Sequence, residues 1–174
     1  MATLYTIEEV LDAARAQRIS MCVKGWETES NGRSEVRIFK VSPPLSAGDI
    51  SPAFLRSLPL AALEGADEQK LVIVPAAPSH VFSTLFAAAA NGGAYSSGRY
   101  GAYGRLHAWA SLAAIVANDD IWQIEAVAQQ MAGCAWFDIG TTTDWFYRVA
   151  WDILLVALLP DGQHVITFAA TDTD

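Results

Sequence analysis

The sequence predicts one α+β domain, in which an antiparallel or mixed sheet of about five to six strands packs against three to four helices. Three observations support this class. A length of 174 residues is typical of a single domain, and 52% hydrophobic residues are enough for a packed core. Alternating apolar segments, typical of strands, are interspersed with segments of helical periodicity. No linker or repeat divides the chain, so residues 1–174 are predicted to be one domain.

The first quarter of the chain is predicted to form a helix and then a hairpin. Thr6 and Glu9 have the spacing of a capping box, which predicts that a helix begins at residue 6. Asn31-Gly32 is typical of a tight hairpin turn. The alternating segments 20–28 and 34–41 are therefore predicted to be paired strands.

The middle of the chain is predicted to hold a short buried strand and most of the helical residues. The wholly apolar run from Leu71 to Val74 predicts that strand. Ser51-Pro52 is typical of the start of a short helix, since serine caps helices and proline suits their first turn. Longer helices are predicted over residues 79–90, over 102–117, and from Asn118 or Asp119 to Gly133.

The C-terminal part is predicted to be mostly strand. Residues 135–139 form one predicted strand, and Pro160-Asp161-Gly162 has the chemistry of a turn between strands 151–159 and 163–171. The stretch 144–159 is ambiguous, because Asp144, Arg148 and Asp152 also have helical spacing. A short helix over 143–149, followed by the two strands, reconciles these signals.

Charge is distributed unevenly along the chain. The net charge is −8, and residues 106–174 contain nine acidic side chains against one basic side chain, together with five of the six tryptophans. An acidic field repels phosphate backbones, so nucleic acid is not an expected partner, whereas a basic protein surface is. The N-terminus lacks the features of a signal peptide, and prolines interrupt the uncharged stretch 71–98, so a cytoplasmic protein without a membrane helix is expected.

A segment rich in glycine and tyrosine, residues 92–105, is the first candidate site. Its glycines precede a helix, whose exposed amides could hold an anion with help from arginines. The alternative is a close-packed loop in which glycine allows backbones to approach. The candidate ligand or partner contacts in this segment are Tyr95, Arg99, Tyr100, Tyr103 and Arg105.

The second candidate site is an aromatic and acidic cluster that contains Asp138, Asp144, Trp145 and Asp152. Aromatic faces beside carboxylates suit a cationic or sugar-like ligand, or a basic protein side chain. The alternative is that the tryptophans belong to the core and the aspartates between them are solvated. No histidine or cysteine spacing indicates a metal site, and no serine or cysteine has the context of a nucleophile, so no catalytic residue, metal or cofactor is predicted.

Several segments of the second half resemble an uncharacterised bacterial family of unknown function. They are Gly92-Gly93-Ala94-Tyr95, the segment Gly101–Leu106 with Ala108-Trp109, and the closing segments 149–152, 160–162 and 169–174. The resemblance covers residues 80–174. It implies a bacterial origin and no particular activity or cofactor.

The leading hypothesis is a non-enzymatic binding protein, of the immunity or antitoxin kind, whose acidic aromatic-rich C-terminal half masks a basic partner. The alternative is a small hydrolase or transferase that uses the segment 92–105 with Asp138 or Asp152. A third interpretation is a subunit that acts in assembly, and self-association stays open.

Overall fold

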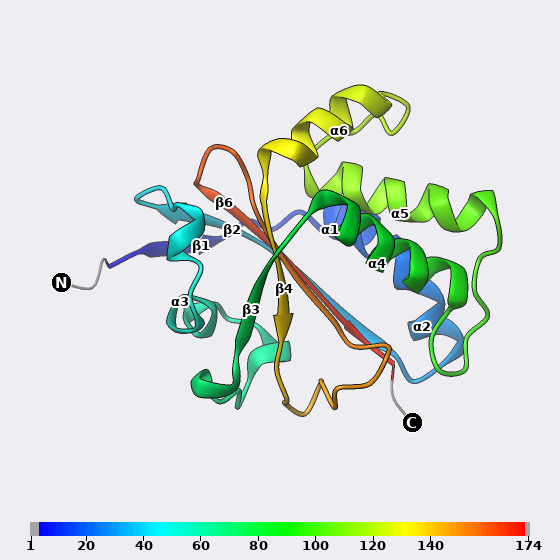
Figure 1. The fold of residues 1–174 in the computed structure, drawn as a ribbon, viewed down its shortest axis with the longest axis horizontal. Helices are drawn as coiled ribbons and strands as arrows, with labels where there is room; N and C mark the ends of the chain where they lie inside the picture. Colours follow the sequence, from blue (N-terminus) through cyan, green and yellow to red (C-terminus); the bar gives the residue numbers. More distant parts are fainter. Residues whose placement is uncertain (1–3, 173–174) are drawn as a thin grey trace.

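The computed structural model describes residues 4–172, and within them six strands form one open sheet (Figure 1). The strand order is β1-β2-β6-β5-β4-β3, and every neighbouring pair is antiparallel. The strands are β1 (Thr6–Glu9), β2 (Arg33–Ser42), β3 (Val72–Ala76), β4 (Ala135–Gly140), β5 (Ile153–Leu158) and β6 (His164–Thr171). The α+β prediction is therefore confirmed.

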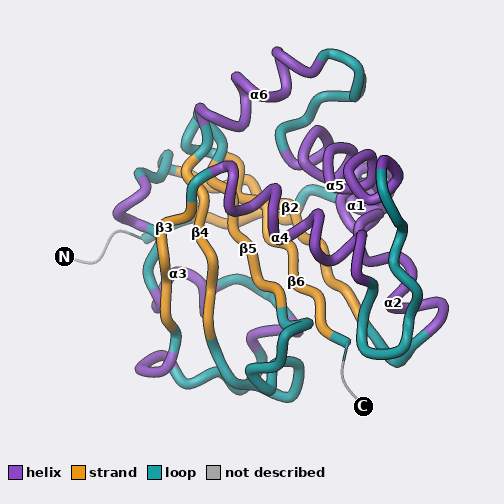
Figure 2. The backbone as a smooth tube through the Cα atoms, turned by 45° about the vertical axis from the view of Figure 1, so that its right-hand side comes forward, coloured by secondary structure: helices purple, strands orange, loops and turns teal. Residues whose placement is uncertain are grey.

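Helices and loops cover both faces of the sheet, and each face has its own core. One face carries α1 (Ala13–Ile19), α2 (Lys24–Glu29), α4 (Pro78–Asn91), α5 (Ala102–Ile115) and α6 (Ile124–Gly133). The other face is covered by α3 (Pro52–Ser57) and the irregular chain around it. Helix α6 stands apart from the others and buries only Val127 and Met131 (Figure 2).

The two central C-terminal strands are apolar on both sides, as the sequence predicts. Leu155, Ile166 and Phe168 belong to the core beneath the helices, whereas Leu154 and Val156 belong to the core on the opposite face. Strand alternation thus places β5 and β6 at the centre of both cores. Trp151 is half-buried at the edge of the helix-covered core.

Most helices and the C-terminal hairpin lie where they are predicted. Helix α4 ends at Gly92, which has the positive φ of 74° that favours glycine. Gly162 takes the same left-handed conformation, with φ 68°, in the turn between β5 and β6. Helix α3 begins after Ser51, whose side chain accepts a hydrogen bond from the N–H of Phe54.

The predicted helix from residue 6 is wrong, because residues 6–9 form β1. Ile7 packs into a core while its neighbours point outward, and Glu9 forms an ion pair with Arg37 of β2 at 2.8 Å. Pairing with β2 therefore prevails over the capping-box signal. The first helix begins instead after Asp12, whose side chain accepts a hydrogen bond from the N–H of Arg15.

The predicted hairpin 20–28/34–41 is wrong in its first arm. Residues 20–29 are helical, and Cys22, Val23 and Trp26 face the core with helical spacing. Gly32 lies beside the end of this helix, where a Cβ would come within 2.6 Å of the Trp26 Cβ. Asn31-Gly32 therefore ends a helix, and β2 pairs with β1 and β6 instead.

Three smaller predictions also need correction. Residues 143–149 form a loop, in which Arg148 has φ 61°, outside helical values. β3 is an edge strand with exposed Val72 and Val74, not a buried one. Helix α6 begins at Ile124, because turns occupy much of the connection after α5.

Candidate functional site

The acidic and aromatic cluster is only partly assembled. Asp138 of β4 and Asp152, just before β5, line the same pocket of about 420 Å³. Trp145 does not line that pocket. It packs against the core on the sheet face that α3 covers, with the Arg33 guanidinium 4.4 Å from its ring centre. Asp144 accepts a hydrogen bond from Arg33 through its main-chain oxygen. The structure thus brings together two of the four predicted residues.

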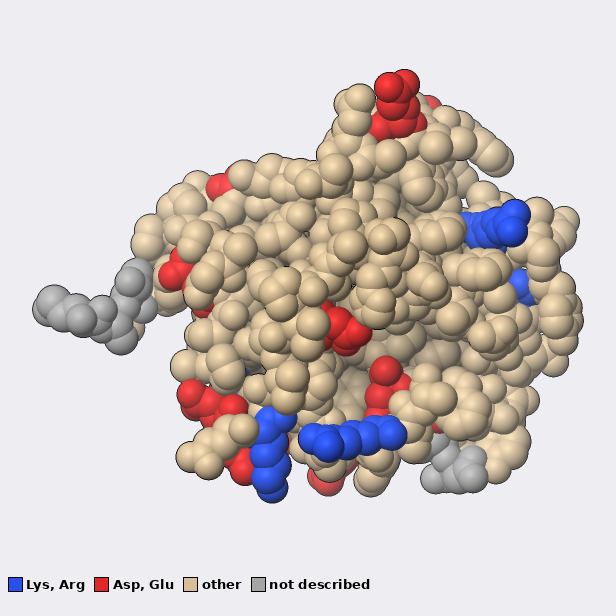
Figure 3. Space-filling view, viewed as in Figure 1, with Lys and Arg blue, Asp and Glu red and all other residues tan. Residues whose placement is uncertain are grey.

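A second pocket, of about 490 Å³, shares Asp152 with the first. It lies between the C-terminal half of α4, Gly92 and Gly93, and the segment from Ala150 to Ile153. We call the two adjoining pockets the groove. Figure 3 shows this face with acidic side chains in its hollowed centre and basic side chains along the lower edge.

The two carboxylates of the groove have different roles. Asp152 accepts hydrogen bonds from the Thr171 hydroxyl at 2.6 Å and from the N–H of Val149 at 3.0 Å, so it holds the loop before β5 in place. Asp138 contacts Nε2 of His80, in the first turn of α4, at 2.9 Å, and both side chains are about half exposed. Asp138 is therefore the carboxylate with more freedom to meet a ligand.

The glycine- and tyrosine-rich segment is a close-packed loop. A Cβ on Gly98 would lie 1.8 Å from the Ala90 oxygen, and one on Gly104 would lie 2.6 Å from the Arg99 oxygen. Gly101 has a positive φ of 62°. These observations confirm that the backbone itself requires glycines here.

The tyrosines and arginines of that loop do not contribute to the groove pockets. Tyr95, Tyr100 and Tyr103 are exposed, as are Arg99 and Arg105, and none of these five residues lines either groove pocket. Only Gly92 and Gly93 join the loop to the groove. Partial burial lowers the pKa of the neighbouring His107, and the positive charges of Arg99 and Lys24 add to this effect.

A surface that the sequence analysis did not single out lies at the start of α6. Trp122 is 75% exposed and Ile124 is 59% exposed. Exposed carboxylates lie close to them in the sequence, from Asp119, Asp120 and Glu125. We call these five residues the α6 surface. Its sequence signal is an acidic run that contains a tryptophan, but exposure becomes visible only in the fold.

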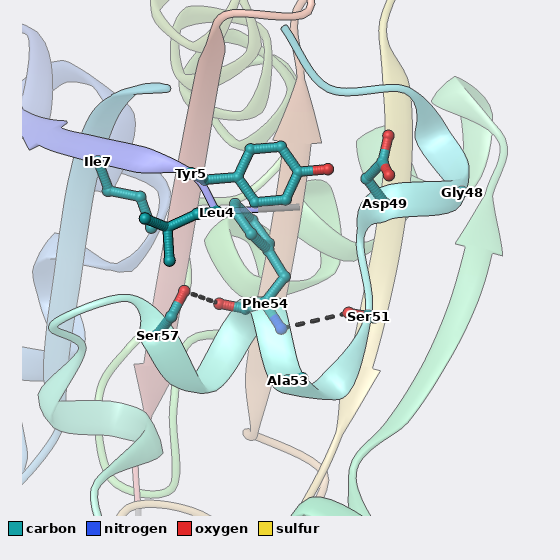
Figure 4. A pocket seen from close by; sticks show the side chains of 9 residues that line it. All are labelled: Leu4, Tyr5, Ile7, Gly48, Asp49, Ser51, Ala53, Phe54 and Ser57. Carbon is teal, nitrogen blue, oxygen red and sulfur yellow. Dashed lines mark hydrogen bonds between the residues drawn. The ribbon is translucent and has the colours of Figure 1, made fainter. Parts of the chain in front are cut away.

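A further pocket, of about 440 Å³, lies between β1 and α3 (Figure 4). Tyr5 and Phe54 meet edge to face in its wall, with ring centres 5.9 Å apart. Its polar groups are engaged locally, because Asp49 accepts hydrogen bonds from Ser46 and the Ser57 hydroxyl donates to the Phe54 oxygen. Hydrogen bonds from Ser46 and then Tyr5 lower the pKa of Asp49. This pocket therefore belongs to the anchoring of β1.

Two further features, a metal site and a membrane-spanning helix, are not found among the described residues. Among residues 4–172, no three histidine, cysteine or acidic side chains are grouped as a metal site requires. None of the helices in that range combines the length and apolar character needed to cross a membrane.

The whole chain, not only its second half, matches a known family, over residues 2–174. The chain belongs to DUF6183, a family of unknown function. No curated protein and no solved structure matches it. For DUF6183 the function therefore has to be inferred from the geometry of the surface and the groove.

Proposed function

We propose that this protein is a non-enzymatic binding protein that docks a basic protein partner on the α6 surface. The observation that carries the proposal is the pair of exposed apolar side chains, Trp122 and Ile124, within an acidic rim. Tryptophan is enriched among the residues that dominate binding energy, and exposed apolar clusters with polar rims are typical of interaction sites.

Hydrogen bonds and an ion pair hold the residues of the α6 surface in place, which favours docking without rearrangement. The Trp109 indole N–H donates to the Ile121 oxygen at 2.9 Å, and Arg18 forms an ion pair with Asp119 at 2.7 Å. Asp120 accepts a hydrogen bond from the N–H of Trp122 at 3.0 Å. A preordered surface loses less conformational entropy when a partner binds.

The charge of the surface indicates the kind of partner. Asp120 and Glu125 are exposed carboxylates, and no lysine or arginine occurs between Leu106 and Tyr147. The Arg18 charge is paired with Asp119, so the remaining rim is negative. Such a rim steers a basic protein toward the tryptophan, as an immunity or antitoxin-like protein would steer the protein that it masks.

A photo-crosslinking amino acid placed at position 122 tests the proposal in the source cells. We expect it to capture a basic protein that the same group at position 147, another exposed aromatic position, does not capture. With the captured partner purified, a variant carrying Asp120→Lys and Glu125→Lys should associate more slowly at low salt, and the difference should shrink at high salt. Capture of an acidic protein, or an unchanged association rate, would contradict the proposal.

The enzymatic alternative is supported by a different observation, because Gly92, Gly93 and Asp152 line one pocket. Asp138, which lines the adjoining pocket beside His80, would be the acid–base group of a hydrolase or transferase. A screen of ester, glycoside and phosphoester substrates should then detect an activity that Asp138→Asn abolishes. Asp161→Asn is the matched control, since Asp161 also contacts a histidine, His164, but in the turn between β5 and β6.

A further inference from the structure

We propose that the groove binds a saccharide or a similar polyhydroxylated molecule. The α6 surface contributes no residue to either pocket, so this inference does not depend on the proposed function. Its starting point is the pair of adjoining pockets, of about 420 Å³ and 490 Å³, that meet at Asp152. Small ligands usually bind in hollows of about 300–1,000 Å³.

Two buried polar atoms in the groove walls have no hydrogen-bond partner among the described residues. One is the indole nitrogen of Trp26, a residue that is 2% exposed and lines the pocket beside α4. The other is the hydroxyl of Thr141, a residue that is 4% exposed and lines the pocket beside β4. Buried polar groups are nearly always paired in folded proteins, so each pocket is lined by one residue with a hydrogen-bonding group that the described residues leave unpaired.

The other polar groups of the groove determine the ligand class. Asp138 and Asp152 accept hydrogen bonds, Arg148 donates them, and Asn91 does both. The two carboxylates disfavour an anion, while Arg148 disfavours a simple cation in the same pocket. Hydroxyl groups both donate and accept, so a neutral polyol satisfies carboxylates, arginine and the Trp26 N–H together.

Aromatic and small residues complete the fit. Trp151 lines the pocket beside α4 and is half-buried, so part of its indole is accessible to the apolar face of a sugar ring. Gly93 packs so closely against Asp172 that a Cβ on Gly93 would come within 1.8 Å of a carboxylate oxygen. At Gly93 the wall of the pocket beside α4 therefore consists of backbone alone. The lining of the groove therefore includes one partly accessible aromatic ring together with carboxylates, an arginine and an asparagine.

A titration followed by amide and indole NMR signals tests this inference. The probes are glucose, galactose, mannose, N-acetylglucosamine and their common disaccharides, each at millimolar concentration. At least one should cause saturable shifts at Gly93, Gly140 and Thr141, and the Trp26 indole signal should move as that N–H gains an acceptor. Signals of Trp122 at the α6 surface should stay in place.

Matched variants link the binding to the groove. Asp138→Asn and Asn91→Ala should each weaken binding about tenfold, since each removes or alters a hydrogen-bonding group of a pocket wall. Asp161→Asn, at the other end of β5, should bind like the unaltered protein. Asp152 is avoided because it holds Thr171 and Val149. L-lysine, a cation at neutral pH, is added as a comparison probe. The inference is overturned if none of the sugars shifts the groove signals, or if only L-lysine does.

Discussion

Asp172, fully buried after the end of β6, accepts a hydrogen bond from the main-chain N–H of Ala94 at 2.6 Å. Its other carboxylate oxygen accepts from the Ser30 hydroxyl at 2.7 Å. One carboxylate thus fastens the loop after α4 and the turn before β2 to the last strand. This contact fixes the glycine wall of the groove.

We expect Asp172→Ala to lower the free energy of unfolding by about 2 kcal/mol, because it leaves two partly buried donors without their charged acceptor. Urea denaturation followed by tryptophan fluorescence measures the change. Glu64→Ala, which removes an exposed carboxylate, should change stability by less than about 0.5 kcal/mol. Equal stability of the two variants would show that the hydrogen bonds accepted by Asp172 contribute little to stability.

Gly98 should tolerate no side chain, whereas Gly48 should tolerate alanine. A Cβ on Gly98 would overlap the Ala90 oxygen, so Gly98→Ala should destabilise the fold by more than about 2 kcal/mol. A Cβ on Gly48 would lie 3.8 Å from the Ser46 hydroxyl oxygen, an ordinary van der Waals distance, so Gly48→Ala should be close to neutral. Thermal unfolding of both variants checks this pair, and a stable Gly98→Ala protein would mean that the loop can rearrange.

Ala117, just after α5, has a left-handed φ of 60°, which is strained for alanine. Ala117→Gly should therefore raise the free energy of unfolding by about 0.5–1 kcal/mol. The same change at Ala128, an exposed position inside α6, should lower it by about 1 kcal/mol. Opposite shifts of the melting temperature are the expected result, and shifts of the same sign would contradict it.

The sequence predicts best those elements whose ends are marked by proline or glycine. Pro78 and Gly92 bound α4, and the Pro160–Gly162 turn sets the register of β5 and β6. β1 escapes prediction because four residues form a strand only when β2 is alongside, with Thr6 opposite Ser42. Tertiary pairing decides such short segments, and local patterns do not encode it.

The candidate site follows the same division. Asp138 and Asp152 come together because β4 and β5 are neighbours, with Asp138 opposite Leu155. Because β4 and β5 follow each other along the chain, sequence patterns can indicate that these two residues lie near one another. The His80–Asp138 contact spans 58 residues and depends on how α4 crosses the sheet. Trp122 resembles the core tryptophans in sequence, and only the outlying position of α6 leaves it exposed.

The buried thiol of Cys22 should make stability fall at high pH. Burial raises the pKa of Cys22 from 9.0 to about 12. The folded protein therefore holds this proton more tightly than the unfolded chain does. The resulting stabilisation is complete below pH 9 and is lost as the pH rises toward 12. Between pH 9 and 11 the free energy of unfolding should fall more steeply than in Cys22→Ala, by about 1 kcal/mol per pH unit.

Alkylation gives an independent measure of the same effect, because the thiolate is the reactive form. At pH 8 iodoacetamide should leave Cys22 unmodified in the folded protein and modify Cys134 slowly. Cys134 is only partly buried, and burial raises its pKa to about 11. In urea both cysteines should react at the same rate, as mass spectrometry of the modified peptides would show. Cys22 lies in the same core cluster as Leu112 and Phe168, so iodoacetamide can reach it only when the helices over the sheet open. Rapid modification of Cys22 in the folded protein would therefore mean that these helices open far more readily than their packing implies.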